Sequence, residues 1–546
     1  MIPPRTCVDP AGRFIVGIHN PSFSVKNLRD SEYPDTLGRD EEGRDVYNRV
    51  NFPMADLDEP GADPIYEVAN AFDFKGTSYI NSAWADAKAE KPETIRIAGP
   101  GPCSFMENLK SSAGIAEGVT DPERLIALLP HPLKVALAQA STDPEELTLL
   151  ARLSCTILFD PHDGTAPAGI GYKNKNSRRV PDITDHELFE VLVNNPCLPD
   201  SYKNVLVLKP GVQGENEITG EYRSEDGKTH VFEYLRRNSY IPWGHFASNM
   251  ANDAVRYSAL ELSQADMTGI RHLYYQRAYV RMAEQLGINP PKDRACLDTA
   301  RLETLRQAIA EKSSGPAADR PEFDTALWGW NFGFGYAQSG HRLHASHQMI
   351  HQQNAMIPGT VPTTSGGQMD AFACGDQVAR FIGQFKESTG QDFFPAYIDA
   401  VRNNTRTDGR PDRPDSLVVA EDDNILLFAP KAQICEFELQ LIPKTACGNV
   451  FEADTGMRRS LDRAILTAVQ VLESLGAKLV TSIEYSKRFG ADNGQHLVYS
   501  FIPRLPYAPP TFSEAQNRWI CGLYPEDFAS ACKAAVPDEM IFFGNT

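Results

Sequence analysis

The sequence predicts an α+β protein, in which antiparallel sheets each carry one long helix and a large extension precedes them. The order strand, strand, long helix, strand, strand occurs twice, in residues 204–350 and 425–503, which indicates tandem duplication of one unit. The 546 residues also exceed the length at which one hydrophobic core stops growing. We therefore expect an N-terminal extension with helices over 1–200, a first repeat over 201–400 and a second repeat over 401–546.

The extension shows two kinds of pattern. Residues 1–115 are rich in Pro, Gly, Asp and Asn, which predicts loops and short strands wrapped on another domain. Two helices are expected between residues 121 and 159, because Asp121 and Asp143 each precede a proline, glutamates and apolar residues at helical spacing. Aspartate as N-cap with proline at the first helical position is a strong start signal.

The first repeat is expected to begin with strands at 204–208 and 230–235. A long amphipathic helix over 260–286 follows, because apolar residues recur there at helical spacing and Gly287 is placed to end it. The later elements are a helix-prone segment at 290–321, a histidine-bearing strand, a helix at 370–389 and a mobile loop or linker at 400–416.

The second repeat has the same order of elements. Its expected strands are 425–429, 435–443, 478–485 and 495–503. Between the second and third of these, residues 459–475 have the pattern of a long amphipathic helix that ends before Gly476.

The composition excludes several classes of protein. A net charge of −19 argues against nonspecific nucleic-acid or acidic-membrane binding, and the one basic run, at 173–179, is read as a solvated loop. Ten dispersed cysteines without a CxxC pair predict reduced thiols rather than a disulfide framework. No apolar leader or membrane-length segment is visible, so we expect a cytoplasmic protein without nucleic-acid or membrane partners.

Histidines are concentrated in one short segment. Residues 341–351 hold four of the twelve histidines, His341, His344, His347 and His351. Imidazole can act near neutral pH as a base, nucleophile or metal ligand, so function is expected here. The spacing of three, three and four residues would suit metal binding on a helix face better than on a strand.

Several short motifs together resemble the histidine-triad superfamily. In the first repeat they are PWGH at 242–245, NFG at 331–333 and AQS at 337–339, followed by the histidines. In the second repeat, FELQLIPK at 437–444 and HLVYSFIPR at 496–504 resemble the IIPK and HxHxExxPR segments of uridylyltransferases. The doubled unit resembles the two-repeat branch, which includes galactose-1-phosphate uridylyltransferase and the dinucleoside-polyphosphate phosphorylases.

The resemblance implies nucleotidyl transfer, in which the second family histidine attacks an α-phosphate to form a covalent nucleotidyl-histidine. Counting from Ser339, the family histidines lie three, five and seven residues further on, where this chain has Arg342, His344 and Ser346. His344 therefore stands at the nucleophile position. Its chemistry needs a neutral imidazole and nearby donors that absorb charge on the phosphoryl oxygens.

Strand alternation supports His344 and leaves one alternative. It places Arg342, His344, Ser346 and Gln348 on one face. Arg342 could contact phosphate there, and Ser346 or Gln348 could donate hydrogen bonds. A one-residue bulge would instead put His344 and His347 at the first and second histidine positions. His344, His347 and Gln348 are therefore the candidate catalytic residues, and the choice of nucleophile between the two histidines stays open.

The remaining site expectations follow from the same resemblance. The candidate substrate-binding residues, which would orient phosphate and ribose, are Asn331, Gln338, Ser339, Arg342 and Ser346. Some uridylyltransferases carry a structural metal, but the CxxC is absent here and the second-repeat motif retains only His496. We therefore expect no metal and no cofactor.

Three functions are weighed. The first is a nucleotidyltransferase or phosphorylase acting on a nucleotide-sugar or dinucleotide-type phosphate ester through nucleotidyl-histidine. The second is a noncatalytic protein that keeps the fold and binds a nucleotide or phosphorylated metabolite, because the flanking triad histidines are missing. The third is a metal-dependent hydrolase that uses the histidine cluster. The expected partner is a nucleotide or nucleotide-sugar, and the resemblance allows a homodimer.

Overall fold

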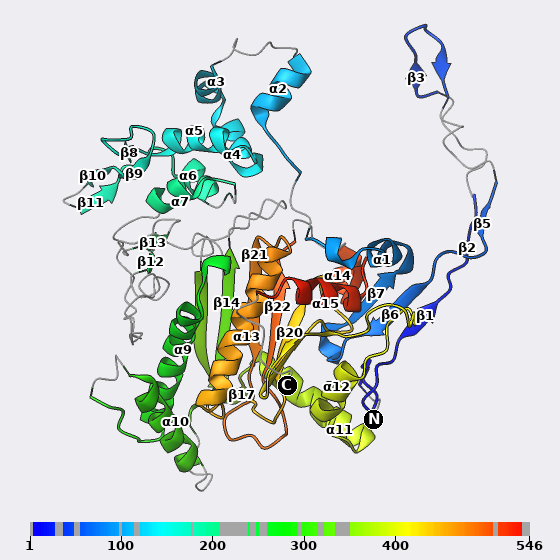
Figure 1. Ribbon diagram of the computed structural model, residues 1–546, viewed down its shortest axis with the longest axis vertical. Coiled ribbons are helices and arrows are strands. Elements are labelled where there is room, and N and C mark those ends of the chain that lie inside the picture. Colours follow the sequence, from blue (N-terminus) through cyan, green and yellow to red (C-terminus); the bar gives the residue numbers. More distant parts are fainter. Residues whose placement is uncertain are drawn as a thin grey trace.

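The computed structural model describes residues 4–27, 36–47, 55–97, 101–113, 121–175, 178–193, 195, 197–206, 238–240, 247–249, 259–292, 297–313, 321–333, 350–505 and 511–537. Within these residues the chain is an α+β protein, as the sequence predicts. Its centre is a seven-stranded antiparallel sheet; N-terminal strands and a helix lie beside it (blue), and a group of N-terminal helices lies above it (cyan) (Figure 1).

The strands of the central sheet follow the order β15-β14-β21-β22-β20-β19-β18. Their bounds are β14 Phe323–Gly333, β15 Ile350–Pro358, β18 Val418–Glu421, β19 Ile425–Phe428, β20 Leu439–Pro443, β21 Leu479–Tyr485 and β22 Val498–Pro503. β19 is buried at every position, because Ile425 and Leu427 enter the core on one face and Leu426 and Phe428 enter the core on the other. The sheet therefore separates two hydrophobic cores.

Two long helices, α9 (Gln264–Gln285) and α13 (Thr455–Ser474), lie side by side on one face of the sheet (Figure 1). α9 begins with a capping box between Ser263 and Asp266, and α13 begins where the Asp454 side chain accepts from the backbone N–H of Met457. Each helix ends before a glycine of positive φ, Gly287 or Gly476. Both predicted long helices are confirmed, and α10 (Thr299–Ser313) packs beside α9.

Two helix-strand-strand groups meet at the middle of the sheet. β14 and β15 follow α9, and β21 and β22 follow α13. Because β14 pairs antiparallel with β21, β15 and β22 lie on the two outer sides of that pair. The strands expected before α9 fall largely in residues 207–258, most of which lie outside the described residues, so the tandem duplication stays a prediction.

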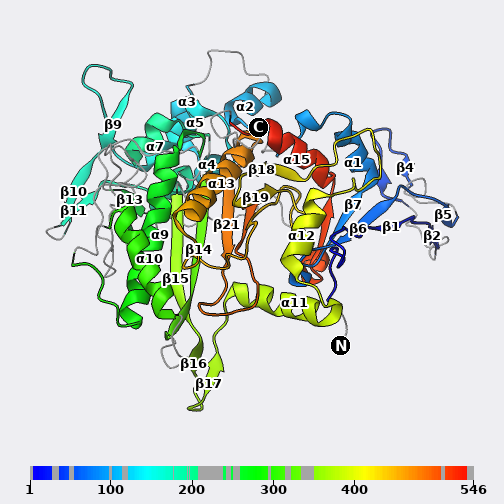
Figure 2. The same cartoon turned by 60° about the horizontal axis from the view of Figure 1, so that its bottom comes forward.

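The opposite face of the sheet is covered from β18 to β22 by N-terminal residues and by two later helices, α11 (Cys374–Thr389) and α12 (Phe393–Arg402) (Figure 2). The N-terminal contribution includes a second sheet of order β1-β6-β7-β23. Its elements and the helices beside it are β1 Gly17–His19, β6 Ile65–Ala69, β7 Thr77–Asn81, β23 Arg518–Cys521, α1 Ser82–Ala89, α14 Thr511–Ala515 and α15 Pro525–Ala534. β23 pairs parallel with β7, so the C-terminal region closes onto the N-terminal one.

A helical unit with its own core lies between residues 101 and 206. Its elements are α2 Phe105–Ala113, α3 Pro122–Leu128, α4 His131–Ala140, α5 Pro144–Ser154, β8 Ile157–Phe159, β9 Pro167–Ile170, β10 Tyr172–Lys175, β11 Arg178–Pro181, α6 His186–Val193 and α7 Asp200–Leu206. Both predicted aspartate-proline starts are confirmed, but the expectation of two helices is wrong, because α4 begins between them after Pro130. The predicted strand at 204–208 is also wrong where it is described, because a turn at Pro199 starts a helix instead.

The segment at 400–416 is not a mobile linker, contrary to the prediction. The guanidinium of Arg406 is buried and donates to both carboxylate oxygens of Asp527, each at 2.7 Å. Nearby, Lys431 and Thr407 both bind the Glu526 carboxylate of α15. The charged residues that suggest a loop therefore hold it against α15.

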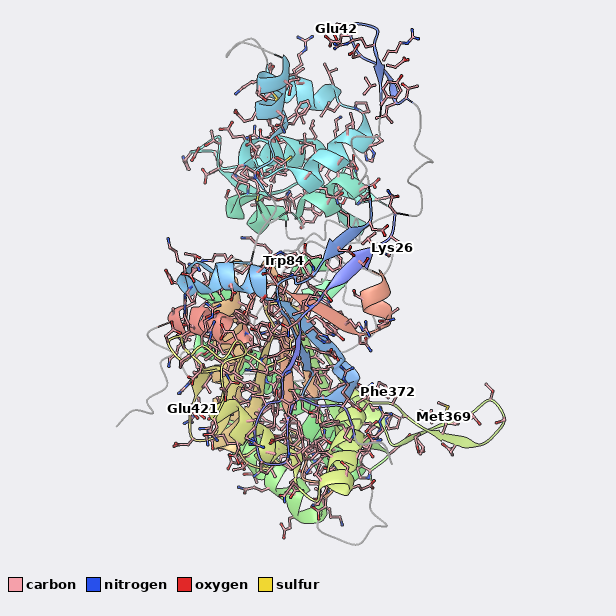
Figure 3. The ribbon with its side chains drawn as sticks, turned by 90° about the vertical axis from the view of Figure 1, so that its right-hand side faces the viewer. Lys26, Glu42, Trp84, Met369, Phe372 and Glu421 are labelled. Atoms are coloured by element: carbon pink, nitrogen blue, oxygen red, sulfur yellow. The ribbon has the colours of Figure 1, made fainter. Side chains whose placement is uncertain are left out.

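Small two-stranded ribbons project from the body. They are formed by β2 Phe23–Val25 with β5 Leu57–Glu59, β3 Gly38–Arg39 with β4 Asp45–Val46, and β16 Thr360–Pro362 with β17 Gln368–Asp370, and a further pair is β12 Asn238–Tyr240 with β13 Ala247–Asn249. Figure 3 shows Glu42 at the tip of one ribbon and Met369 on another, both far from the sheet. None of the helices in the described ranges is long and apolar enough to span a membrane.

A buried arginine connects the two helix-strand-strand groups. The Arg271 side chain of α9 is fully buried; its Nε donates to Asp462 Oδ1 at 3.2 Å and its Nη2 donates to the Tyr499 hydroxyl at 2.8 Å. Glu484 Oε2 lies 3.7 Å from the same Nη2. The indole of Trp328 lies against the guanidinium, with its ring centroid 4.4 Å away. One cation therefore contacts α13, β14, β21 and β22.

We expect Arg271→Met to lower the free energy of unfolding by about 3–5 kcal/mol, because it leaves the buried Asp462 and Glu484 carboxylates without their cation. Urea denaturation measures the loss. The matched control is Arg402→Met, which breaks the exposed ion pair with Glu421 and should cost about 0–1 kcal/mol. Equal losses in the two variants would contradict the central role of Arg271.

The same cluster predicts a pH dependence of stability. Burial raises the pKa of the Asp462 carboxyl from 3.8 to about 6, although Arg271 and the Tyr275 hydroxyl lower it. A raised carboxyl pKa means that the folded state binds the extra proton, so this contribution is complete below pH 3.8 and is lost as the pH rises through about 6. Asparagine cannot lose this proton. The difference in unfolding free energy between Asp462→Asn and the natural protein should therefore shift in favour of the variant as the pH rises from about 4 to about 7, measured by urea denaturation. A difference that stays constant over this range would count against the raised pKa.

Candidate functional site at one end of the central sheet

Most of the predicted site residues lie in the segment 334–349, outside the described residues. They are the catalytic candidates His344, His347 and Gln348 and the substrate-binding candidates Gln338, Ser339, Arg342 and Ser346. Their roles stay predictions. The backbone of Asn331 is described, within β14.

The residues on either side of that segment lie together at one end of the sheet. β14 ends at Gly333, β15 begins at Ile350, and Phe332 pairs with Ile350. Asn331 pairs with His351 on one side and with Thr481 of β21 on the other. The histidine segment therefore leaves from and returns to the end of the sheet where the strands of the two groups meet.

Below this end, the face of the sheet opposite α9 and α13 is partly exposed. Along β14, Trp328 and Trp330 are buried in the core beneath the helices. Leu327, which precedes them, and Gly329, which lies between them, are partly exposed. β21 shows the same alternation, with Ile483 partly exposed on this face. Because Gly329 pairs with Ile483, these residues form one continuous surface across both strands.

Two cations lie at the end of this surface. The Arg504 side chain is exposed, its Nε donates to the Thr481 hydroxyl at 3.1 Å, and its backbone N–H donates to the Leu479 carbonyl. Lys478 is exposed immediately before β21. Neither cation has a carboxylate partner within the parts of the chain that the structure describes. In a chain with a net charge of −19, two exposed cations beside Gly333, the last described residue before the histidine segment, favour an anionic ligand.

On β20 and β22, the same face of the sheet is covered by N-terminal residues of the chain. Lys75 Nζ lies 2.8 Å from Glu438 Oε1 and donates to Ser500 Oγ at 2.7 Å, and all three side chains are buried. Burial lowers the pKa of the Lys75 ammonium, but the Glu438 carboxylate together with Tyr485 and Cys435 raises it, and the net shift is upward from 10.5. Gln440 completes the cluster by donating to Glu438 and accepting from the Tyr397 hydroxyl.

Sequence reasoning missed this closure. Lys75 and Glu438 are 363 residues apart, and Lys75 belongs to a segment without a recognisable motif. The available signal was the presence of Glu438 and Gln440 within the otherwise apolar run FELQLIP, because polar residues in a buried strand need internal partners.

His496, which the sequence relates to a family histidine, is buried and held in place by its neighbours. Its Nδ1 donates to the Pro443 carbonyl oxygen at 2.8 Å, and its ring stacks on Phe394 with centroids 4.4 Å apart. Burial lowers its pKa below the usual 6.5, although the bond to Pro443 raises it. The ring is therefore neutral and held on both sides. Within the described parts of the chain, no group of three or more His, Cys, Asp or Glu side chains could hold a metal ion.

No known family model matches the chain, and no curated protein matches it. Among solved structures, it is similar to a GalT-like protein from Arabidopsis thaliana, with a TM-score of 0.32 and 12% identity over 51% of this chain and 72% of that one. It is also similar to an ADP-glucose phosphorylase from Arabidopsis thaliana with bound ADP-glucose, at a TM-score of 0.32 and 12% identity over 51% and 70% of the two chains. A uridylyltransferase gives a TM-score of 0.33 and 11% identity over 60% and 92%. TM-scores of 0.32 and 0.33 do not establish a common fold.

Proposed function

We propose that this protein transfers a nucleoside monophosphate group between phosphorylated partners through a covalent nucleotidyl-histidine. The substrate is a nucleotide-sugar or a dinucleotide-type phosphate ester, and the acceptor is a phosphate oxygen of a second phosphorylated molecule or of inorganic phosphate. His344 is the proposed nucleophile and His347 is the alternative. The two helix-strand-strand groups are proposed to derive from the two histidine-triad repeats that the sequence motifs indicate.

One observation carries the proposal. The segment that contains three of the four clustered histidines begins and ends at paired residues of β14 and β15. Lys478 and Arg504, which have no carboxylate partner in the described parts of the chain, lie beside the end of β14. A nucleophilic imidazole and an anion-binding edge are the two parts that attack on a phosphate requires. The buried histidines His272 and His496 lie away from any exposed surface, so they do not offer an equivalent nucleophile.

The proposed reaction has two balanced steps. In the first, an imidazole nitrogen attacks the α-phosphorus, a P–N bond forms, and the bond from phosphorus to the bridging oxygen breaks. The bridging oxygen leaves with the electron pair as part of a phosphate anion. In the second step, a phosphate oxygen of the acceptor attacks the same phosphorus, the P–N bond breaks, and the neutral imidazole is restored. Arg504 is proposed to offset the charge on the phosphoryl oxygens.

The test is covalent labelling of the full chain with UTP, ATP, UDP-glucose, ADP-glucose and diadenosine polyphosphate, each carrying radioactive phosphorus at the α-position. We expect label on the protein that is acid-labile and base-stable, as a phosphoramidate is. His344→Ala should reduce the labelling by about 1,000-fold or more, because no other group replaces a lost nucleophile. If His347 is the nucleophile, His347→Ala shows this loss instead.

Two histidine variants serve as controls. His162→Ala removes an exposed histidine of the helical unit, and His496→Gln alters the buried ring that stacks on Phe394. Both should keep full labelling under conditions where they are folded. Absence of label with every nucleotide, or undiminished label in both His344→Ala and His347→Ala, would remove the proposal. Thermal stabilisation by a nucleotide without label would instead favour a noncatalytic binding protein.

A further inference from the structure

Gly329 lies in the middle of β14, at a place where the described residues around it do not require a glycine. Its φ is not positive, so the backbone conformation is open to any residue. A Cβ at this position would have one neighbour within 4 Å, the Ser482 carbonyl oxygen at 3.6 Å, which is an ordinary van der Waals contact. The described structure therefore leaves room for a side chain.

The residues beside Gly329 make a glycine at this position more unexpected. Trp328 and Trp330 flank it, and glycine in a strand loses stability relative to the β-branched and aromatic residues that strands prefer. A glycine inside a strand often marks a bulge, a tight bend, or a place where a ligand or another backbone approaches closely. β14 has its register shift at Phe323 to Thr325, well before this glycine.

The face around Gly329 carries the apolar side chains of Leu327 and Ile483 and the paired residue Gln353, and it leads to a cationic edge. Gly329 lies on the partly exposed face of the sheet, with Leu327 two residues away along the strand and Ile483 opposite it on β21. One row of the pleat further, about 7 Å along the strand, Thr481 meets the Arg504 guanidinium. A ligand that fits both parts has a planar apolar group joined through a short linker to an anion, which is the chemistry of a nucleotide.

We propose that the backbone of Gly329 forms the floor of a base-binding subsite, on which the planar base of the nucleotide lies while its phosphate points to Arg504. This proposal rests on the proposed function, since it names the place where the substrate of that reaction is held. The missing side chain creates the space for the base. Residue 329 therefore determines whether a nucleotide, rather than a sugar phosphate without a base, gains affinity.

Base-dependent binding tests the subsite without requiring catalysis. Calorimetric titration of the full chain with UMP, AMP and ribose 5-phosphate measures the affinity that the base adds. For the natural protein we expect UMP or AMP to bind more tightly than ribose 5-phosphate. Gly329→Val should weaken binding of the preferred nucleotide by about 10-fold or more and leave binding of ribose 5-phosphate unchanged, because the side chain would occupy the space of the base.

The matched control is Gly169→Val in β9, a strand glycine of the helical unit that also has open space at its Cβ position. It should leave all three affinities unchanged. Thermal unfolding should show that both variants are folded and at least as stable as the natural protein, because valine suits a strand better than glycine. Gly329→Ala, with a smaller side chain, should give an intermediate loss of nucleotide affinity.

Each other outcome decides the question. Unchanged nucleotide affinity in Gly329→Val overturns the base subsite and leaves the nucleotidyl-histidine proposal standing. Equal weakening of ribose 5-phosphate shows a general distortion of the sheet and also overturns it, as does unfolding of both Gly329 variants, since the fold would then require the glycine. If neither UMP nor AMP binds the natural protein, the base subsite is overturned, and labelling with complete substrates still tests the reaction independently.

Discussion

The burial of the Arg271 guanidinium is the constraint on which the arrangement of the central sheet depends. A buried cation costs several kcal/mol in desolvation, and this cost is offset only when carboxylates and hydroxyls meet it with good geometry. Here the partners are Asp462 on α13, Glu484 on β21 and Tyr499 on β22, while Trp328 of β14 packs on its plane. A shift of either helix against the sheet would separate charges that have no access to water. The position of β14 beside β21 is thereby set at the centre of the molecule.

Fixing one face of the sheet determines what the other can do. The large aromatic residues of β14 are buried beneath α9 and α13. On the other face, the layer formed by N-terminal residues, α11 and α12 buries Tyr485 of β21 and partly buries Ile483. Lys75 closes β20 and β22 by binding Glu438 and Ser500. The N-terminal part is therefore integral to the fold, and it leaves the β14 and β21 face as the partly exposed one. This asymmetry supports one site at the end of the sheet in place of two equivalent ones.

The elements that the sequence predicts well are those specified by local residues. α9 and α13 follow from apolar spacing, from the caps at Ser263 and Asp454, and from the glycines that end them. The second-repeat strands follow from short apolar runs. The failures come from contacts between residues distant in sequence. The charged segment around Arg406 is read as a linker because its partner Asp527 is 121 residues away. The predicted domain boundaries at residues 200 and 400 stay predictions, as do the histidine roles, since 334–349 lies outside the described residues.

The strongly shifted ionisable groups in the described residues of this protein do not mark an accessible site. A strongly shifted pKa is often a sign of a functional site, but that inference requires access to a substrate. Burial raises the pKa of Asp462 to about 6 and lowers that of His272 to about 4, yet both side chains are enclosed by the core. The shift of Asp462 records the cost of burying its charge between α13 and α9, and the shift of His272 records its burial beside the Leu297 carbonyl. Chemistry on an anionic substrate needs groups that are exposed and not already neutralised, and Lys478 and Arg504 have both properties within the described residues. These perturbed groups are therefore enclosed in the core and unavailable to a substrate, whereas Lys478 and Arg504 are exposed beside the end of β14, where the histidine segment begins.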